Sequence, residues 1–279
     1  MKMRRIATAL SVGVITVTSM VTSASASGVV PPANPRNEVW AVPIYSFTLR
    51  NHGSIKAGGA LPACWGWGRS LTFVARPTAP HCVAEELSAT NRAHHSEGLG
   101  SIGLPRNFIK LSAADQMLVI TDIERVSRGE DPVLGIEAPL NVYAQQGAVG
   151  GYDPVVGSMS SIDGATGGFA SNYAASVNTL DANYEWMYTD GWDGKDTANA
   201  DCTSATAPGC WGHRDNILLN ASRMACEVAA CSLVMGAGFV NNGRHDGYSS
   251  FSELFVQISG VTPVLSYTWA QAVAAGAHG

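Results

Sequence analysis

The sequence predicts an α+β fold. Segments in the middle of the chain place apolar residues at helical spacing, whereas the end of the chain changes to the spacing of strands. Helices that come first and a hairpin that comes last are typical of helices packed on an antiparallel sheet. The chain has 279 residues, enough for one domain with a full core.

The N-terminus has the parts of a secretory signal peptide. Basic residues at the start precede an apolar stretch over 6–21, and the small residues SASAS follow it. We expect cleavage after Ala26, which removes residues 1–26. A membrane anchor is the alternative, but the apolar stretch contains Thr and Ser and is shorter than the roughly 20 residues that a spanning helix needs. The sequence therefore predicts a secreted, extracellular protein.

The mature chain is expected to be acidic. The sequence has 17 basic and 22 acidic residues, and loss of Lys2, Arg4 and Arg5 leaves 14 against 22, a net charge of −8. Nucleic acid and anionic membrane surfaces are therefore poor partners. We expect a monomer with no membrane span once the signal peptide is removed.

Six cysteines in an exported chain indicate three disulfides. The sequence leaves the pairing open, but short spacings favour Cys202–Cys210 and Cys226–Cys231, and Cys64–Cys82 is then the remaining pair. The alternative is a zinc site, because Cys210 and His213 have ligand-like spacing with Cys202 nearby. An oxidising compartment favours the disulfides.

Helices are expected from the first part of the main domain onward. Residues 27–81 are rich in Pro and Gly and are expected to form an extension packed on a main domain over 82–262. A helix over 82–99 carries His94 and His95, which point to different faces, so we expect both at the surface.

The next helix, over 112–129, is the clearest in the chain. Ser112 and Asp115 resemble a capping box at its start, and Gly129 ends it. A shorter helix over 139–147 begins at Pro139 and ends at Gly147.

The second half of the chain begins with polar and small residues. Residues 148–180 are mostly Gly, Ser, Asn and Asp, which predicts a long loop. A helix over 180–191 follows, with Asp181 as its expected cap. The segments 232–240 and 249–260 read as two antiparallel strands. Residues 263–279 are expected to form a C-terminal tail.

The segment CWGHRDNILLN, residues 210–220, carries the densest chemical signal. His213 is expected in the first turn of a helix, where the helix dipole disfavours the imidazolium, so we expect a neutral ring near neutral pH. A neutral imidazole can accept a proton, bind a metal or form a hydrogen bond. The alternative is that His213 only satisfies backbone groups at a helix start beside Trp211.

The order of these pieces resembles the CAP superfamily of cysteine-rich secretory proteins, antigens and pathogenesis-related proteins, in its secreted bacterial form. GHRDNIL at 212–218 carries the resemblance, with YEWMY before it and MGAGFV and FSELFVQ after it. The resemblance implies an α-β-α sandwich, a central antiparallel sheet covered by helices. It also implies a cleft lined by two histidines and two acids that can hold a divalent metal, with His213 as one histidine.

The other cleft positions depart from the family pattern. Asp153 in GYDP stands where bacterial relatives have a histidine, ASN at 170–172 stands where they have GEN, and the acid after Trp186 falls near Asp190. The candidate metal ligands are therefore His213, Asp153 and Asp190. One imidazole and two carboxylates make an incomplete zinc site, so we expect no cofactor beyond a weakly bound divalent metal.

The resemblance implies a secreted binding or interaction module that uses a polar cleft around His213. Ligands in the family range from sterols and other lipids to cell-surface proteins, and the ligand of this chain is left open. The alternative is a secreted hydrolase, directed at peptides or the cell wall, in which His213 works with Asp190 or with Glu185, a residue expected to be exposed. The sequence contains no H-E-x-x-H, G-x-S-x-G or P-loop motif, which favours the binding role over an enzyme.

Overall fold

The fold is described from a computed structural model. The predicted signal peptide and most of the predicted extension, residues 27–81, lie outside the described residues. The structure describes residues 65–67, 73–75, 79–192, 199, 201–204, 206–207, 209–219, 231–241 and 248–279.

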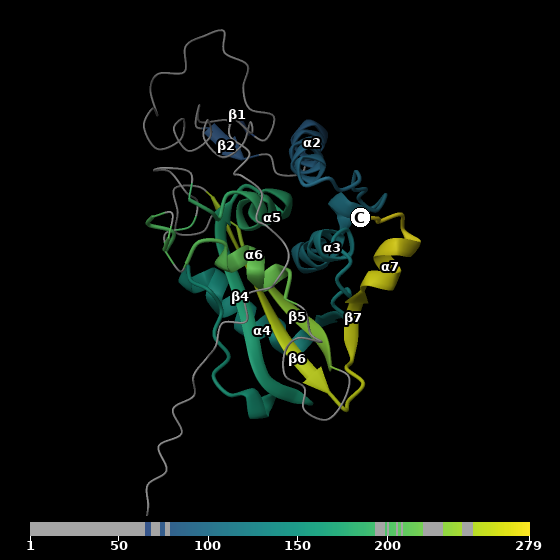
Figure 1. Ribbon diagram of the computed structural model, residues 1–279, viewed down its shortest axis with the longest axis vertical. Coiled ribbons are helices and arrows are strands. Elements are labelled where there is room, and N and C mark those ends of the chain that lie inside the picture. The colour runs from purple at the N-terminus through teal and green to yellow at the C-terminus, as the bar shows by residue number, and fades with distance from the viewer. Residues whose placement is uncertain are drawn as a thin grey trace, which may run out of the picture.

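The chain forms an α+β fold around a five-stranded sheet, as the sequence predicts (Figure 1). The strand order is β4-β6-β5-β3-β7, and β1 and β2 form a separate antiparallel pair. The pairing of β3 with β5 is parallel and the other pairings are antiparallel, so the sheet is mixed rather than antiparallel throughout. The strands are β1 (Trp65–Trp67), β2 (Phe73–Ala75), β3 (Gly135–Glu137), β4 (Ala165–Ser176), β5 (Cys231–Val240), β6 (Ser249–Ser259) and β7 (Leu265–Thr268).

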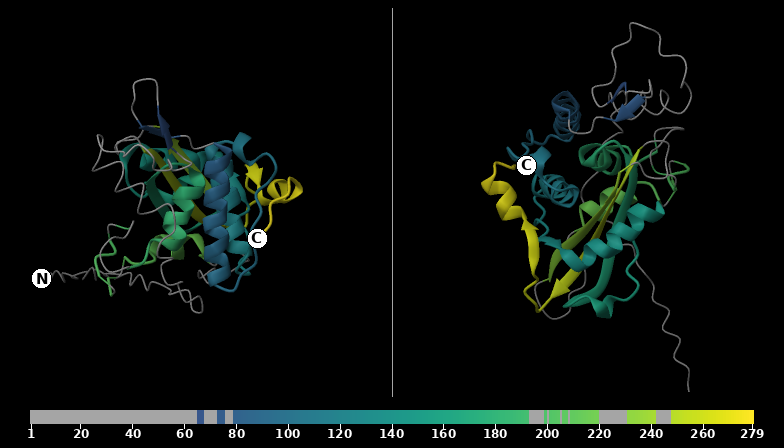
Figure 2. Two further views of the ribbon diagram at one scale, coloured as in Figure 1. Left: turned by 90° about the horizontal axis from the view of Figure 1, so that it is seen from above. Right: turned by 180° about the vertical axis from the view of Figure 1, so that it is seen from behind.

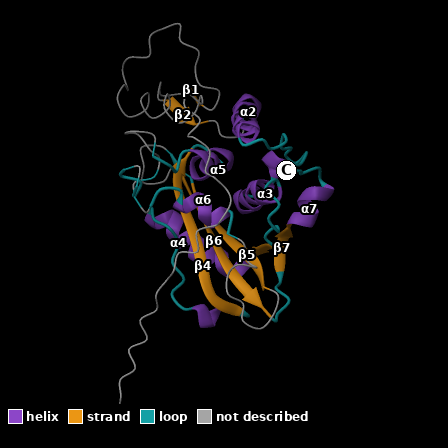
Figure 3. Cartoon of the chain, in the orientation of Figure 1, coloured by secondary structure: helices purple, strands orange, loops and turns teal. Residues whose placement is uncertain are grey.

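Helices cover both faces of the sheet, which gives the expected three layers. The described α-helices are α2 (Pro80–Ser96), α3 (Ala113–Val126), α4 (Ala138–Gly150), α5 (Thr179–Tyr188), α6 (Gly212–Ile217) and α7 (Trp269–Ala274). Helix α4 packs on one face of β5 and β6, and α3, α5 and α6 lie on the other (Figures 2 and 3). No helix in the described ranges is long and apolar enough to cross a bilayer.

Alternation along β5 separates the two layers. Met235 belongs to the core shared with α3 and α5, whereas its neighbour Val234 belongs to the core shared with α4. Gly236 faces α4, where an added Cβ would lie 2.3 Å from the carbonyl carbon of Leu140. The glycine therefore allows the backbones of α4 and β5 to meet closely, an approach that no larger residue permits.

Several predicted elements are confirmed. The Ser112 side chain accepts a hydrogen bond from the Asp115 N–H and caps α3. Helix α4 covers the predicted 139–147, and β5 and β6 are the predicted antiparallel pair. Residues 263–279, expected as a tail, contribute the edge strand β7 and α7 to the fold.

Two expectations for residues 148–191 are wrong. The expected loop over 148–180 contains the 12-residue strand β4. Its small polar residues form a strand because β6 supplies a long antiparallel partner, and such pairing overrides weak local preference. The cap of α5 is Asn178 rather than Asp181, since the Asn178 side chain accepts from the Asp181 N–H.

The cysteine predictions are confirmed in one case. Cys202 and Cys210 form a disulfide, which removes both from the alternative zinc site. Cys82 and Cys231 each belong to a further disulfide. Cys64 and Cys226 lie outside the described residues, so the pairs Cys64–Cys82 and Cys226–Cys231 stay predictions.

His94 is buried, which contradicts its expected surface position. Its Nε2 lies 2.9 Å from Glu124 Oε2, and the Tyr188 hydroxyl donates to the same carboxylate at 2.8 Å. Burial alone would raise the pKa of Glu124, but Arg128 and His94 lower it to about 2. A buried carboxylate needs such partners, and this need draws His94 inward.

A second buried ion pair connects α6 to the C-terminal end of α2. Arg214 is almost fully buried, donating from Nη1 to the Met187 carbonyl at 2.7 Å and from Nη2 to Glu97 Oε2 at 2.8 Å. The other Glu97 oxygen accepts from Arg128 Nη2 at 2.7 Å. Glu97 therefore joins the C-terminal end of α2 to both α3 and α6.

We predict that Gly236→Ala destabilises the fold by about 2 to 3 kcal/mol, because the methyl group overlaps the α4 backbone. Urea denaturation followed by circular dichroism measures this change. Gly157→Ala is the control, because an added Cβ there meets nothing within 4 Å, and it should change the free energy of unfolding by less than about 0.5 kcal/mol. Equal stability of the two variants would contradict the close approach of α4 and β5.

Candidate functional site

His213 is presented by an unusual turn at the start of α6. Trp211, the residue before the helix, has φ 66°, the left-handed conformation that non-glycine residues rarely adopt. Gly191 makes room for its indole, because a Cβ at Gly191 would lie 2.1 Å from a ring carbon of Trp211. The turn brings His213 beside the segment that follows α5.

Asp190 holds both the ring and the backbone of His213. Its Oδ1 lies 2.7 Å from His213 Nδ1, and its Oδ2 accepts the His213 backbone N–H at 2.9 Å. The Asp190 side chain is 1% exposed, so water competes little for these bonds. A carboxylate bonded in this way fixes the orientation of the imidazole.

Asp153 approaches the opposite edge of the ring. It lies in the turn after α4, and its Oδ1 is 3.5 Å from His213 Nε2. The Asp153 side chain is 48% exposed and that of His213 is 19% exposed, so this edge faces solvent. The structure thus brings His213, Asp190 and Asp153 together from three separate parts of the chain.

The two carboxylates decide the charge of the ring. Burial lowers the pKa of His213, but hydrogen bonds and charge interactions with Asp153 and Asp190 raise it to about 10. The expectation of a neutral ring near neutral pH is therefore wrong. The helix dipole opposes the imidazolium by only about 0.3 to 1 kcal/mol, and two neighbouring negative charges outweigh it.

A polar layer that the sequence reasoning missed lies under His213. The side-chain amide of Asn172, on β4, donates to the His213 carbonyl at 3.1 Å and to Glu253 Oε1 at 2.8 Å. Burial raises the pKa of Glu253 to about 7, although its hydrogen bonds act in the opposite direction. One sequence signal was present, because Glu253 lies between Phe251 and Phe255, two core residues on the same face of β6.

Glu185 does not join this group. It is 8% exposed on α5, so its expected exposure is wrong, and burial followed by the nearby Asp181 raises its pKa. In the described part of the chain, its carboxylate makes no hydrogen bond or ion pair with His213. Of the two acids considered for the hydrolase, Asp190 is therefore the one that contacts His213.

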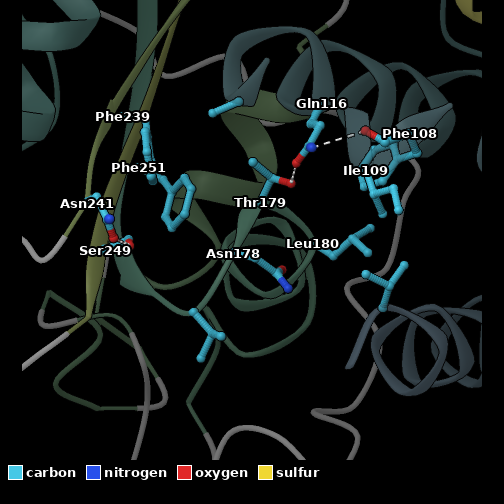
Figure 4. A pocket seen from close by; sticks show the side chains of 13 residues that line it. Phe108, Ile109, Gln116, Asn178, Thr179, Leu180, Phe239, Asn241, Ser249 and Phe251 are labelled. Atoms are coloured by element: carbon cyan, nitrogen blue, oxygen red, sulfur yellow. Dashed lines mark hydrogen bonds between the residues drawn. The ribbon is translucent and has the colours of Figure 1, made fainter. Parts of the chain in front are cut away.

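A hollow of about 210 Å³ lies away from these residues. Figure 4 shows Phe251, Leu180 and Phe108 around it, with the Gln116 amide bonded to Thr179 and to the Phe108 carbonyl at its rim. His213 is not among its lining residues. The hollow sits at the start of α5, whereas Asp190 follows the end of that helix.

The residues around His213 do not fit the divalent metal that the family resemblance implies. The two oxygens of Asp190 are bonded to Nδ1 and to the backbone N–H of His213. Among the described residues, His213 Nε2 and Asp153 are then the groups able to meet at one ion. A stable zinc site needs three or four protein ligands. The described residues contain no group of three or more His, Cys, Asp or Glu that could hold a metal.

Comparison with known proteins adds no relative. No protein-family model matches the chain, and neither a curated protein nor a solved structure matches it. Statements about function therefore depend on the geometry around His213 and on the motifs in the sequence.

We predict that His213 titrates with a pKa near 10, and that Asp190→Asn lowers this value by more than 1. Nuclear magnetic resonance of the histidine ring protons, followed from pH 5 to pH 11, measures it. Asp163→Asn changes an exposed carboxylate elsewhere and is the control.

The raised pKa also predicts how stability depends on pH. Since the folded-state pKa lies above the ordinary 6.5, the stabilisation by His213 is complete below pH 6.5 and is lost as the pH rises towards 10. His213→Gln should lack this decline. A ring that titrates near 6.5 in the wild type would contradict the double-carboxylate arrangement.

We further predict that zinc binds weakly, with a dissociation constant above about 10 µM at pH 7, because two side chains supply few ligands and the ring carries a competing proton. Isothermal titration calorimetry after chelator treatment measures this constant. A stoichiometric, chelator-resistant metal that Asp153→Asn removes would contradict the prediction.

Proposed function

We propose that this protein is an exported binding module of the CAP type, and that it recognises an extracellular ligand through His213 and Asp153. The GHRDNIL segment, the apolar strand after it and the three-layer α+β fold support this proposal. The Cys202–Cys210 disulfide and the signal-like N-terminus agree with an oxidising compartment.

The carboxylates at both ring nitrogens of His213 carry the proposal. An imidazolium with a pKa near 10 donates hydrogen bonds at neutral pH but cannot accept a proton. General-base catalysis needs a group whose pKa lies near the working pH. A fixed donor beside an exposed carboxylate is better suited to holding a polar ligand than to activating a nucleophile.

We propose that the ligand is a lipid head group or a cell-surface protein. Both can offer a hydrogen-bond acceptor for the imidazolium and a donor for Asp153. The acidic charge of the chain disfavours nucleic acid. The protein is proposed to act as a monomer.

A hydrolase is the second candidate, and one observation favours it. Asp190 orients His213 through Nδ1, as a carboxylate does in catalytic dyads and triads. This role requires Asp153 to leave Nε2, and Asp153 is half exposed on a turn. The ring would then keep one carboxylate and titrate closer to neutral pH.

We predict binding without turnover. Titration of ¹⁵N-labelled mature protein with short peptides, soluble cell-wall fragments and lipid micelles should shift the resonances of Asp153 and His213 for at least one of these probes. His213→Gln should weaken that binding at least tenfold, because it removes the charged donor. His95→Gln, at an exposed histidine, is the matched control and should bind normally.

Product analysis of the same mixtures separates the two candidates. Binding with unchanged probes supports the binding module. Cleavage of a peptide or wall fragment by the wild type, lost in a folded His213→Gln variant, would replace this proposal with the hydrolase. Probes that shift only residues far from His213 would also overturn it.

A further inference from the structure

A continuous chain of hydrogen bonds runs under the site from α3 through the sheet to α6. The Thr121 hydroxyl donates to Glu253 Oε2 at 2.9 Å, and Glu253 Oε1 accepts from Asn172 at 2.8 Å. The same Asn172 amide donates to the carbonyl oxygen of His213 at 3.1 Å. Thr121, Glu253 and Asn172 are all fully buried.

The chemistry of Asn172 leaves its amide one orientation. Its NH₂ group faces two acceptors, the Glu253 carboxyl and the His213 carbonyl, and its oxygen accepts from the Asn216 amide at 3.0 Å. A flipped amide would place its oxygen against both acceptors. Asn216 also donates to the Ser171 carbonyl at 2.9 Å, so three hydrogen bonds join α6 to β4.

These hydrogen bonds help to stabilise α6, which is too short to be stable alone. Helix α6 has six residues, and so short a helix is not stable without tertiary contacts. Asp190 fixes the His213 N–H, whereas Asn172 fixes the His213 carbonyl. The two contacts together set the backbone orientation of this residue, and hence the direction of its ring.

We propose that Asn172 and Glu253 are positioning residues for His213, which hold its imidazole between Asp190 and Asp153. Glu253 acts through Asn172, since its carboxyl fixes the amide that binds the His213 carbonyl. Neither residue is assigned contact with a ligand. The functional meaning of this role rests on the proposed binding function, but the positioning itself can be measured without a ligand.

The charges that face Glu253 are consistent with this role. Burial and then the charge of Glu253 raise the pKa of Asp122, on α3. Burial also raises the pKa of Glu253, whereas the charge of His213 lowers it. Asn172 and Thr121 contribute neutral hydrogen bonds that favour the carboxylate. An apolar residue at position 253 would avoid the free-energy cost of burying a carboxyl group. The hydrogen bond that Glu253 accepts from Asn172 gives a reason for an acid at this position.

The test measures the pKa of His213 in variants of the chain of hydrogen bonds. Asn172→Ala should lower the pKa of His213 by about 1, because a looser turn lengthens the contact with Asp190. Glu253→Leu should do the same, since it frees the Asn172 amide. Glu253→Gln retains an acceptor for Asn172 and should restore most of the effect.

Asn141→Ala is the matched control for loss of a structural asparagine. The Asn141 side chain accepts from the Ala237 N–H at 2.8 Å and so joins α4 to β5 on the other face of the sheet. Its loss should lower the melting temperature without moving the pKa of His213. If Asn172→Ala fails to fold, the comparison of Glu253→Leu with Glu253→Gln decides the question alone.

Two results would overturn the proposal. One is that Asn172→Ala and Glu253→Leu lower the melting temperature but leave the pKa of His213 unchanged, as Asn141→Ala does. Asn172 and Glu253 would then have a structural role only. The other is that Glu253→Gln shifts the pKa as far as Glu253→Leu does. A failure to find any ligand would count against the proposed function but would leave this measurement valid.

Discussion

The buried guanidinium of Arg214 is the constraint on which the site depends. A cation placed between helices must be paired, and here Glu97 and the Met187 carbonyl supply the partners. Glu97 in turn binds Arg128, whose other contacts include Glu124. Arg214 thus links α6 to α2, α3 and α5. These contacts help to stabilise α6, because a helix of six residues is not stable alone.

His213 and Arg214 are neighbours with opposite requirements. Arg214 points inward and is satisfied there, so the helix places the preceding side chain at the surface beside Asp190 and Asp153. The left-handed Trp211 makes the entry to this helix possible, and Gly191 makes room for its ring. Structural and candidate functional residues are therefore adjacent in sequence, and a change in either affects both.

The electrostatics around His213 are the basis of the proposed binding role. An imidazole shared between two carboxylates is held charged, while the acid beneath it, Glu253, is held near its titration point by burial. The partly exposed His213 therefore carries a positive charge, and the buried Glu253 beneath it is close to its pKa at neutral pH. The Asn172 amide is hydrogen-bonded to both residues. Such an arrangement resists protonation changes at His213 and keeps the exposed edge of the ring as a donor.

The sequence by itself determined the local features: the Ser112 cap of α3, the strand pair β5 and β6, and a histidine at the start of a helix. These follow from patterns a few residues long, which local sterics and hydrogen bonds decide. The resemblance to the CAP superfamily pointed to the three residues that meet at the site, but not to their contact distances. Tertiary structure decided that β4 is a strand, that His94 is buried and that His213 is charged. Each of these features depends on a partner distant in sequence: β6 for β4, Glu124 for His94, and Asp153 with Asp190 for His213. Electrostatic energy depends on distances in space, which a sequence pattern does not contain.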